Sequence, residues 1–215
     1  MAGRRRPAPH THGVEVVRQR IAEEAARIMA NEGRNDYLTA KRKAAERLGW
    51  QDSRHLPSNR EIEIALVNYI QLFHAHDLPE TLHRQLNIAF ETMHLLAGFD
   101  PRLAGTLLQG IATAFSEVQI QVFPDNPEQV ALLLQEHGIP YEEASRRLRF
   151  GGDQQEAVPA FRFLAGDTPV EISVLPLPAA RAAPLSPVDA RPMKRANLKE
   201  VERLLKNATP PPSAP

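Results

Sequence analysis

Two short segments of the sequence carry carboxylate side chains on expected strands, and carboxylates that meet at one point can bind a metal ion. In residues 116–122, polar side chains alternate with apolar ones, and the polar positions are Glu117, Gln119 and Gln121. A period of two predicts a strand with these side chains on one face. A later segment of the same type, residues 170–175, carries Glu171. Where carboxylate oxygens converge, they can bind magnesium and so assist phosphoryl chemistry.

These segments resemble the nucleotidyltransferase superfamily of the DNA polymerase β type. The resemblance covers about residues 103–175 and rests on three stretches: Leu107-Leu-Gln-Gly110, Ser116-Glu-Val-Gln-Ile-Gln-Val122 and Pro169-Val-Glu-Ile-Ser-Val174. In that family, a strand ending in Gly-Ser or Gly-Gly precedes a Ser-Asp-x-Asp strand, and a later strand adds a third carboxylate. The resemblance implies catalytic positions at Glu117, Gln119 and Glu171, with Glu117 and Glu171 as ligands of Mg²⁺. It also implies a nucleotide site at Gly110, Thr113 and Ser116.

The sequence departs from the family pattern at its centre. Gln119 stands where the family has its second carboxylate, and an amide supplies no negative charge to a metal ion. Ile111 follows Gly110 where the family has a small polar residue. Because ligand charge sets the affinity for hard cations, we expect weak magnesium binding and weak or absent catalysis. The expected ligand is a nucleotide or a protein partner. The solvated face of a half-buried strand would give the same alternation.

Two arginines add a candidate phosphate contact. Arg147 and Arg149 alternate with Leu148 and Phe150, so a strand would direct both guanidinium groups to one face. Guanidinium groups suit phosphate oxygens, which places both arginines in the expected nucleotide site. A surface strand with cross-strand ion pairs is the alternative interpretation.

The periodicity of the apolar residues predicts an α+β fold with a small mixed or antiparallel sheet. Apolar residues at spacings of three and four indicate four helices in the first hundred residues, and Ser58 with Glu61 forms a capping box before the third. A further helix follows Asn126, and Gly166 with Asp167 predicts the turn of a hairpin. Strands are expected at residues 103–109, 117–123, 146–150, 160–164 and 170–175.

The same patterns divide the chain into four parts. We expect a disordered basic tail at 1–13, a helical region at 14–99 and the nucleotidyltransferase-like core at 100–176. Residues 177–215 are rich in proline, and they predict a strap across the core, a short helix and a disordered tail.

Composition excludes several functional classes. The sequence has no cysteine, which excludes disulfides, thiolate metal sites and cysteine nucleophiles. No stretch approaches the roughly 20 apolar residues that span a bilayer, and the first residues lack the apolar part of a signal peptide, so we expect a cytoplasmic protein without a membrane partner. Residues 1–60 hold 13 basic and 7 acidic side chains, whereas residues 61–175 hold 6 and 16.

The basic N-terminal part supports an alternative, a nucleic-acid-binding regulatory protein. Residues 18–50 superficially resemble the start of a TetR-type helix-turn-helix repressor, and Lys41, Arg42 and Lys43 could contact a phosphate backbone. The next helix begins with Glu61 and Glu63, which phosphate would repel. The spacing of the histidines favours surface positions over a metal site.

The two-part layout also resembles a group of uncharacterised bacterial proteins, some of which carry names of the muramate–alanine ligase type. That name implies ATP held by a glycine-rich loop. The Gly-x-x-x-x-Gly-Lys-Ser/Thr pattern of such a loop does not occur in the sequence.

Overall fold

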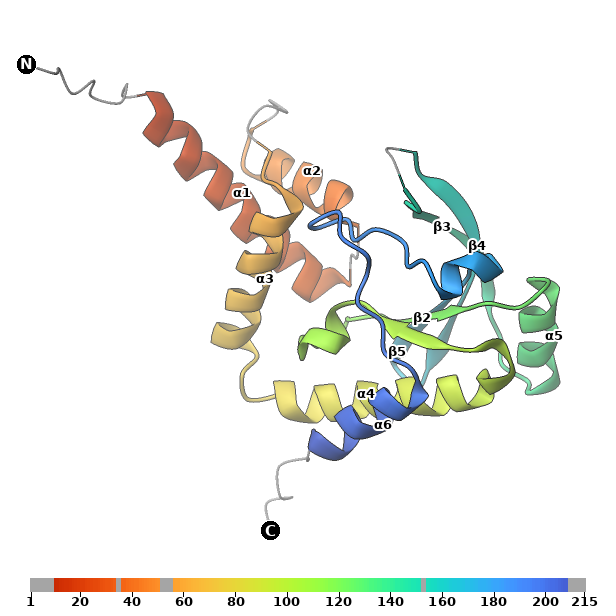
Figure 1. Ribbon diagram of the computed structural model, residues 1–215. Helices are drawn as coiled ribbons and strands as arrows, with labels where there is room; N and C mark the ends of the chain where they lie inside the picture. Colours follow the sequence, from red (N-terminus) through yellow and green to blue (C-terminus); the bar gives the residue numbers. More distant parts are fainter. Residues whose placement is uncertain (1–9, 34–35, 51–55, 152–153, 209–215) are drawn as a thin grey trace, which may run out of the picture.

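The computed structural model describes the chain except for residues 1–9, 34–35, 51–55, 152–153 and 209–215, and its fold is α+β (Figure 1). The helices are α1 (His10–Glu32), α2 (Tyr37–Arg47), α3 (Asn59–Phe73), α4 (Leu78–Leu95), α5 (Glu128–Glu136) and α6 (Leu198–Asn207). The strands are β1 (Arg102–Ala104), β2 (Val118–Val122), β3 (Glu142–Leu148), β4 (Glu156–Ala165) and β5 (Thr168–Val174). Short 3₁₀ helices are η2 (Ala97–Phe99), η3 (Thr106–Gln109) and η4 (Leu177–Ala180).

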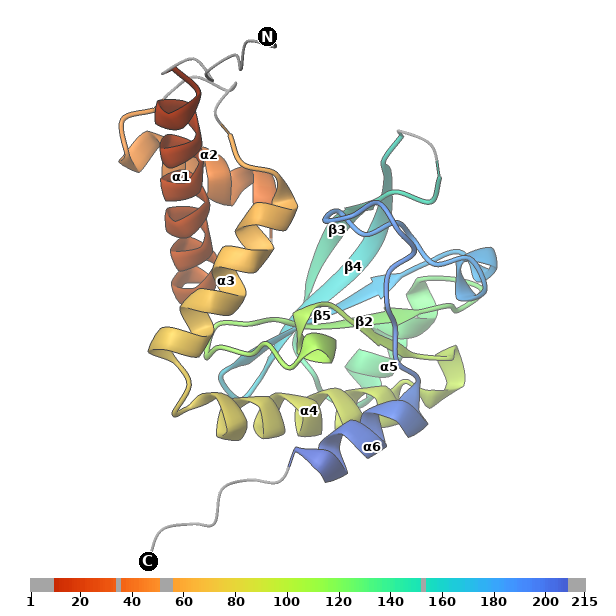
Figure 2. The same ribbon diagram turned by 60° about the vertical axis from the view of Figure 1, so that its left-hand side comes forward.

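The first three helices form a separate bundle with its own apolar core. Asp36 caps α2 by accepting from the backbone N–H groups of Leu38 and Thr39, and the predicted capping box of Ser58 and Glu61 is present at the start of α3. Alanine and isoleucine side chains dominate the interior of the bundle, so the helices approach closely. Figure 2 shows this bundle to one side of the sheet.

The sheet is mixed and has the strand order β1-β2-β5-β4-β3. Only β2 and β5 run parallel; the other neighbours are antiparallel. The predicted hairpin turn at Gly166 and Asp167 joins β4 to β5 and pairs Ala165 with Thr168. One sheet face is apolar, because Val118, Ile120 and Ile172 direct their side chains into a core shared with α4 and α5.

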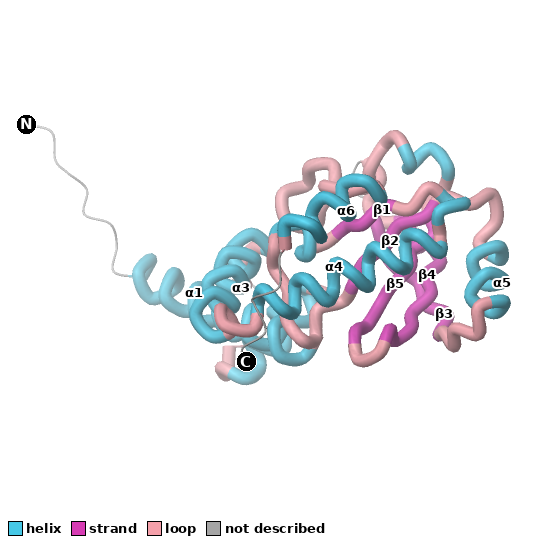
Figure 3. Tube along the Cα trace, turned by 90° about the horizontal axis from the view of Figure 1, so that it is seen from below, coloured by secondary structure: helices cyan, strands magenta, loops and turns pink. Residues whose placement is uncertain are grey.

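Helix α4 belongs to the sheet rather than to the N-terminal bundle. Its Leu86, Ala89 and Met93 lie in the core that contains the strands, and Val201 of α6 joins the same core. Figure 3 shows α4 and α6 side by side against the strands. The boundary between the two apolar cores therefore falls before α4, whereas the sequence divided the chain at residue 99.

The prediction of a strand over residues 103–109 is wrong beyond its first two residues. Strand β1 ends at Ala104, and Thr106–Gln109 is the 3₁₀ helix η3. Gly105 separates them with φ 86° and ψ −166°, a conformation that is essentially restricted to glycine. The chain therefore turns at Gly105, five residues before the predicted turn at Gly110.

The proline-rich segment after β5, here called the strap, runs from one sheet edge to the other. Leu185 bridges to Arg149 just beyond β3, and Ala196 bridges to Leu103 of β1. Between these points, the Met193 sulfur accepts from Gln121 Nε2 at 3.6 Å. The strap therefore covers part of the sheet face that lies opposite to α4.

The helices of the described residues are too short or too polar to cross a lipid bilayer. None of them combines the length and the apolar content that a membrane-spanning helix needs.

Candidate functional site

Polar side chains from four strands meet on the sheet face opposite to α4. Gln119 lies beside Glu171 in the parallel pair, and Glu171 lies beside Arg162 in the hairpin. Paired residues of neighbouring strands project from the same face, so these three side chains form a row. Arg146 of β3 reaches the row, and Glu117 lies directly before β2. We call these five residues the arginine–carboxylate cluster.

Both guanidinium groups of the cluster bind the carboxylate of Glu171. Arg162 donates to Glu171 Oε2 from Nε at 2.9 Å and from Nη2 at 2.6 Å. Arg146 donates from Nη1 to Glu171 Oε1 and from Nη2 to Gln119 Oε1, the latter at 3.0 Å. Glu117 lies at 3.9 Å from Arg146 Nη1 and at 3.8 Å from Arg162 Nε. The two arginines thus bridge all three positions that the resemblance singled out.

Glu171 is the buried centre of the cluster, with a side chain that is 1% exposed. Burial opposes its ionisation, but the charge of Arg146 and the hydrogen bonds from Arg146 and Arg162 outweigh burial and lower the pKa of Glu171 below its ordinary value. The hydrogen bond to Glu171 also raises the pKa of Arg162. The Ser173 hydroxyl adds a further donor to Glu171 at 3.3 Å. The carboxylate is therefore held in its charged form.

The cluster does not fit the magnesium ion that the resemblance implies. Both carboxylate oxygens of Glu171 already accept from guanidinium groups, and the two carboxylates and two guanidinium groups cancel in formal charge. Gln119 contributes a neutral oxygen that is itself bonded to Arg146. Among the described residues, no group of three or more metal-binding side chains is placed to hold an ion. A cation would have to displace arginine from buried oxygens.

The structure brings Glu117, Gln119 and Glu171 together but leaves the predicted arginines outside. Arg147 follows Arg146 on β3 and is paired with Ala157, so it projects from the opposite face. Arg149 lies one residue beyond the end of β3, where its carbonyl accepts from the Leu185 N–H.

Sequence reasoning missed Gly105, Arg146 and Arg162. The signal for Arg162 was available, because a two-residue turn at 166–167 pairs 165 with 168 and hence 162 with 171. Gly105 lies against the cluster: a Cβ at this position would lie 3.0 Å from Gln119 Oε1. Gly110 instead ends η3 with φ 72° and faces open space.

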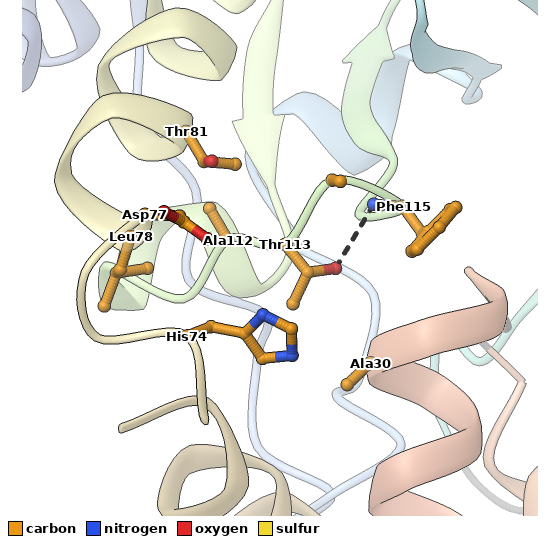
Figure 4. Close-up of a pocket in the computed structure, with 9 residues that line it drawn as sticks. Ala30, His74, Asp77, Leu78, Thr81, Ala112, Thr113 and Phe115 are labelled. Carbon is orange, nitrogen blue, oxygen red and sulfur yellow. Dashed lines mark hydrogen bonds between the residues drawn. The ribbon is translucent and has the colours of Figure 1, made fainter. Parts of the chain in front are cut away.

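The predicted nucleotide residues Thr113 and Ser116 form a tight turn beside the helical bundle. The Ser116 hydroxyl accepts from the Thr113 N–H at 2.9 Å. The Thr113 hydroxyl accepts from the Phe115 N–H at 3.3 Å (Figure 4). The turn borders a cavity of about 70 Å³ that His74 and Thr81 also line. Ligand pockets usually hold about 300–1,000 Å³, so this cavity is too small for a nucleotide.

Gln85 of α4 holds this turn in place through two hydrogen bonds. Its side chain is 1% exposed, and its amide donates to the Thr113 carbonyl at 2.7 Å and to the Ser116 carbonyl at 3.3 Å. We expect Gln85→Leu to destabilise the fold by about 1–3 kcal/mol, because the buried Thr113 carbonyl keeps only the Ser116 N–H as a donor and the partly buried Ser116 carbonyl loses the Gln85 amide. Urea denaturation measures this loss. The exposed Gln129→Leu on α5 is the control and should change stability by less than about 0.5 kcal/mol.

Lys41, Lys43 and Arg47 of α2 form contacts within the protein. Lys43 pairs with Glu32 at 2.5 Å, and Arg47 pairs with Glu32 at 2.8 Å. Lys41 donates to the Pro57 carbonyl at 2.7 Å and to Asn59 Oδ1 at 2.8 Å. These contacts give Lys41 and Lys43 structural partners, so the placement of these side chains does not favour a phosphate-binding surface.

Comparison of the chain with protein-family models, with curated proteins and with solved structures gives no match.

Proposed function

We propose that the sheet and its helices form a nucleotidyltransferase-like core that binds a nucleotide through Arg146 and Arg162, with weak or absent catalysis. The observation that carries this proposal is the contact of both guanidinium groups with the carboxylates at the expected metal positions. In a metal-dependent transferase, magnesium neutralises phosphate charge. Here arginine is the cation available for that role, and it needs no metal ion.

The remaining hydrogen-bonding capacity of the cluster supports an anionic ligand. The bonds to Glu171 use Nε and Nη2 of Arg162, whereas a guanidinium carries five N–H donors. Arg162 is also 50% exposed, so its other donors are accessible from solvent. Phosphate oxygens suit this donor geometry. The carboxylates would hold the two guanidinium groups in position.

Titration of the full chain with ATP, CTP, GTP and UTP, with and without magnesium or manganese, tests the proposal. We expect saturable binding of at least one nucleotide, unchanged by a chelator, because arginine supplies the positive charge. Arg162→Gln should weaken binding by about tenfold or more, since charge-assisted hydrogen bonds contribute roughly 1.5–3 kcal/mol. Isothermal titration calorimetry measures both effects.

Arg147→Gln is the matched control, because Arg147 is the neighbour of Arg146 on the opposite face of β3. It should leave nucleotide binding unchanged. Absence of binding by all four nucleotides would refute the proposal. Binding that requires a divalent metal ion and survives Arg162→Gln would assign the metal role to the carboxylates instead.

A further inference from the structure

A groove between α1 and α3 lies on the helical bundle, away from the arginine–carboxylate cluster. It has a volume of about 590 Å³. Its α3 side consists of residues at helical spacings of three and four, among them Ile64, Asn68 and Leu72. Figure 2 shows α1 and α3 side by side along this part of the bundle.

The α3 side of the groove presents apolar side chains to solvent. Ile64 is 54% exposed, Leu72 is 76% exposed and Phe73 is 69% exposed. The Phe73 ring also contacts the Tyr69 ring in a tilted arrangement, with a centroid distance of 4.8 Å. Large apolar side chains gathered in one groove favour burial against a partner, whereas isolated exposed ones need no explanation.

The α1 side of the groove is acidic. Glu15 and Glu23 of α1 line it, and Glu61 at the start of α3 adds a third carboxylate to the groove. None of the described residues that line the groove is lysine or arginine. Glu61 pairs with Arg18 at 2.7 Å. Glu15 and Glu23 have no cationic partner among the described residues, and Glu23 accepts only from Gln19 Nε2, at 3.0 Å. An occupant with apolar side chains flanked by positive charge would match this surface.

The charge also argues against a second copy of the chain as the occupant. In a two-fold symmetric dimer the same surface contacts itself, so this groove would place Glu15 and Glu23 of both copies close together. Like charges that face one another at an interface cost binding free energy.

We propose that the α1–α3 groove binds an amphipathic helix of another protein, with apolar residues at helical spacing and lysine or arginine along its flanks. Two helices that border a groove commonly accept a third helix in this way, through apolar anchors separated by three, four and seven residues. Leu72 and Phe73 would contact the anchors, and Glu15 and Glu23 would face the basic flank.

Two synthetic 18-residue helical peptides serve as probes. Both carry leucine at the anchor positions; one has lysine at the flanking positions, and the other has glutamate there. Fluorescence anisotropy with the full chain at low salt should show saturable binding of the lysine peptide, about tenfold tighter than the glutamate peptide. Exchanging Glu15 and Glu23 for lysine should reverse this preference.

Leu72→Asp should weaken binding of the lysine peptide by about tenfold or more, because it removes an exposed apolar side chain that would contact the leucine anchors of the peptide. Leu132→Asp, at a leucine of α5 that is 57% exposed, is the control and should leave binding unchanged. Circular dichroism of both variants checks their helix content.

Three outcomes would overturn the proposal. The first is equal or absent binding of the two peptides. The second is a dimer, detected by analytical ultracentrifugation, that Leu72→Asp dissociates, since a second copy would then occupy the groove. The third is peptide binding that occurs only after removal of residues 1–9, since the chain's own arginine-rich segment would then be the occupant.

Discussion

The double variant Arg146→Met and Arg162→Met is expected to lose about 3–5 kcal/mol of stability at pH 7. Both substitutions keep most of the aliphatic stem but remove the guanidinium groups. Glu171 then remains buried among the strands, and the Ser173 hydroxyl is the hydrogen-bond donor that it keeps among the described residues. Removing the charged partners of an ionised carboxylate in the interior is among the most destabilising changes that a fold can undergo.

The pH dependence of this variant should be opposite in sign to that of the wild type. In the wild type, the pKa of Glu171 is below 4.5, the value for the unfolded chain, so the stability that the ion pairs contribute is present above pH 4.5 and is lost as the pH falls through the folded pKa. In the variant the guanidinium groups that lower the pKa of Glu171 are gone, the Ser173 hydroxyl is a neutral donor, and burial raises the pKa. Protonation of Glu171 should therefore stabilise the variant as the pH falls toward 4.5.

Urea denaturation followed by circular dichroism between pH 4.5 and 8 measures both effects. Adding Glu171→Gln to the double variant is the control, because a neutral amide needs no guanidinium partner. This triple variant should recover much of the loss and should lose the reversed pH dependence. A double variant as stable as the wild type at every pH would show that the ion pairs contribute nothing to folding.

Local signals in the sequence predicted the helices and the β4–β5 hairpin. Capping at Ser58 and the turn at Gly166 and Asp167 depend on side chains within a few residues, so one segment suffices to recognise them. The alternation around Glu117 likewise predicted β2. The expectation that Glu171 would lie near Glu117 and Gln119 came from the resemblance to the nucleotidyltransferase family, not from the alternation.

Which arginine of β3 contacts Glu171 could not be predicted in the same way. Residues 146, 147 and 149 are all arginine, and a shift of one residue in the strand exchanges the faces of the sheet. Leu148 suggested the apolar face of β3, but it lies on the same face as Arg146, in a small apolar cluster that also contains Ala179 of η4. The segment after β5 thus buries one end of the sheet face that carries Arg146, which is otherwise polar. Alternation within β3 cannot reveal this burial, because it depends on a segment distant in the sequence.

The conformation of Gly105 also could not be predicted from the spacing of apolar residues. Leu103, Leu107 and Leu108 form an apolar run that is compatible with a strand or with a helical turn. The backbone at Gly105 decides between them. Its close approach to Gln119 depends on the pairing of β1 with β2, in which Ala104 is the partner of Gln119.

We therefore expect Gly105→Ala to destabilise the protein by about 2–4 kcal/mol. The backbone at φ 86° and ψ −166° is strained for any residue with a Cβ, which accounts for about 1–3 kcal/mol. The new Cβ would also lie 3.0 Å from Gln119 Oε1 and 3.3 Å from Gln119 Cδ. Gln119 would have to move, and its hydrogen bond to Arg146 would be lost.

Gly110→Ala provides the matched comparison, because Gly110 also has a positive φ but has no atom within 4 Å of the added Cβ. It should cost about 1–2 kcal/mol, the strain of a left-handed backbone alone. Urea denaturation of both variants gives the difference. In a Gln119→Ala background, Gly105→Ala should cost about 1 kcal/mol less, because the contact with the amide and its hydrogen bond are already absent. Equal costs at Gly105 in both backgrounds would mean that the strain is confined to the backbone, and the close approach of Gly105 to Gln119 would then have no part in positioning the arginine–carboxylate cluster.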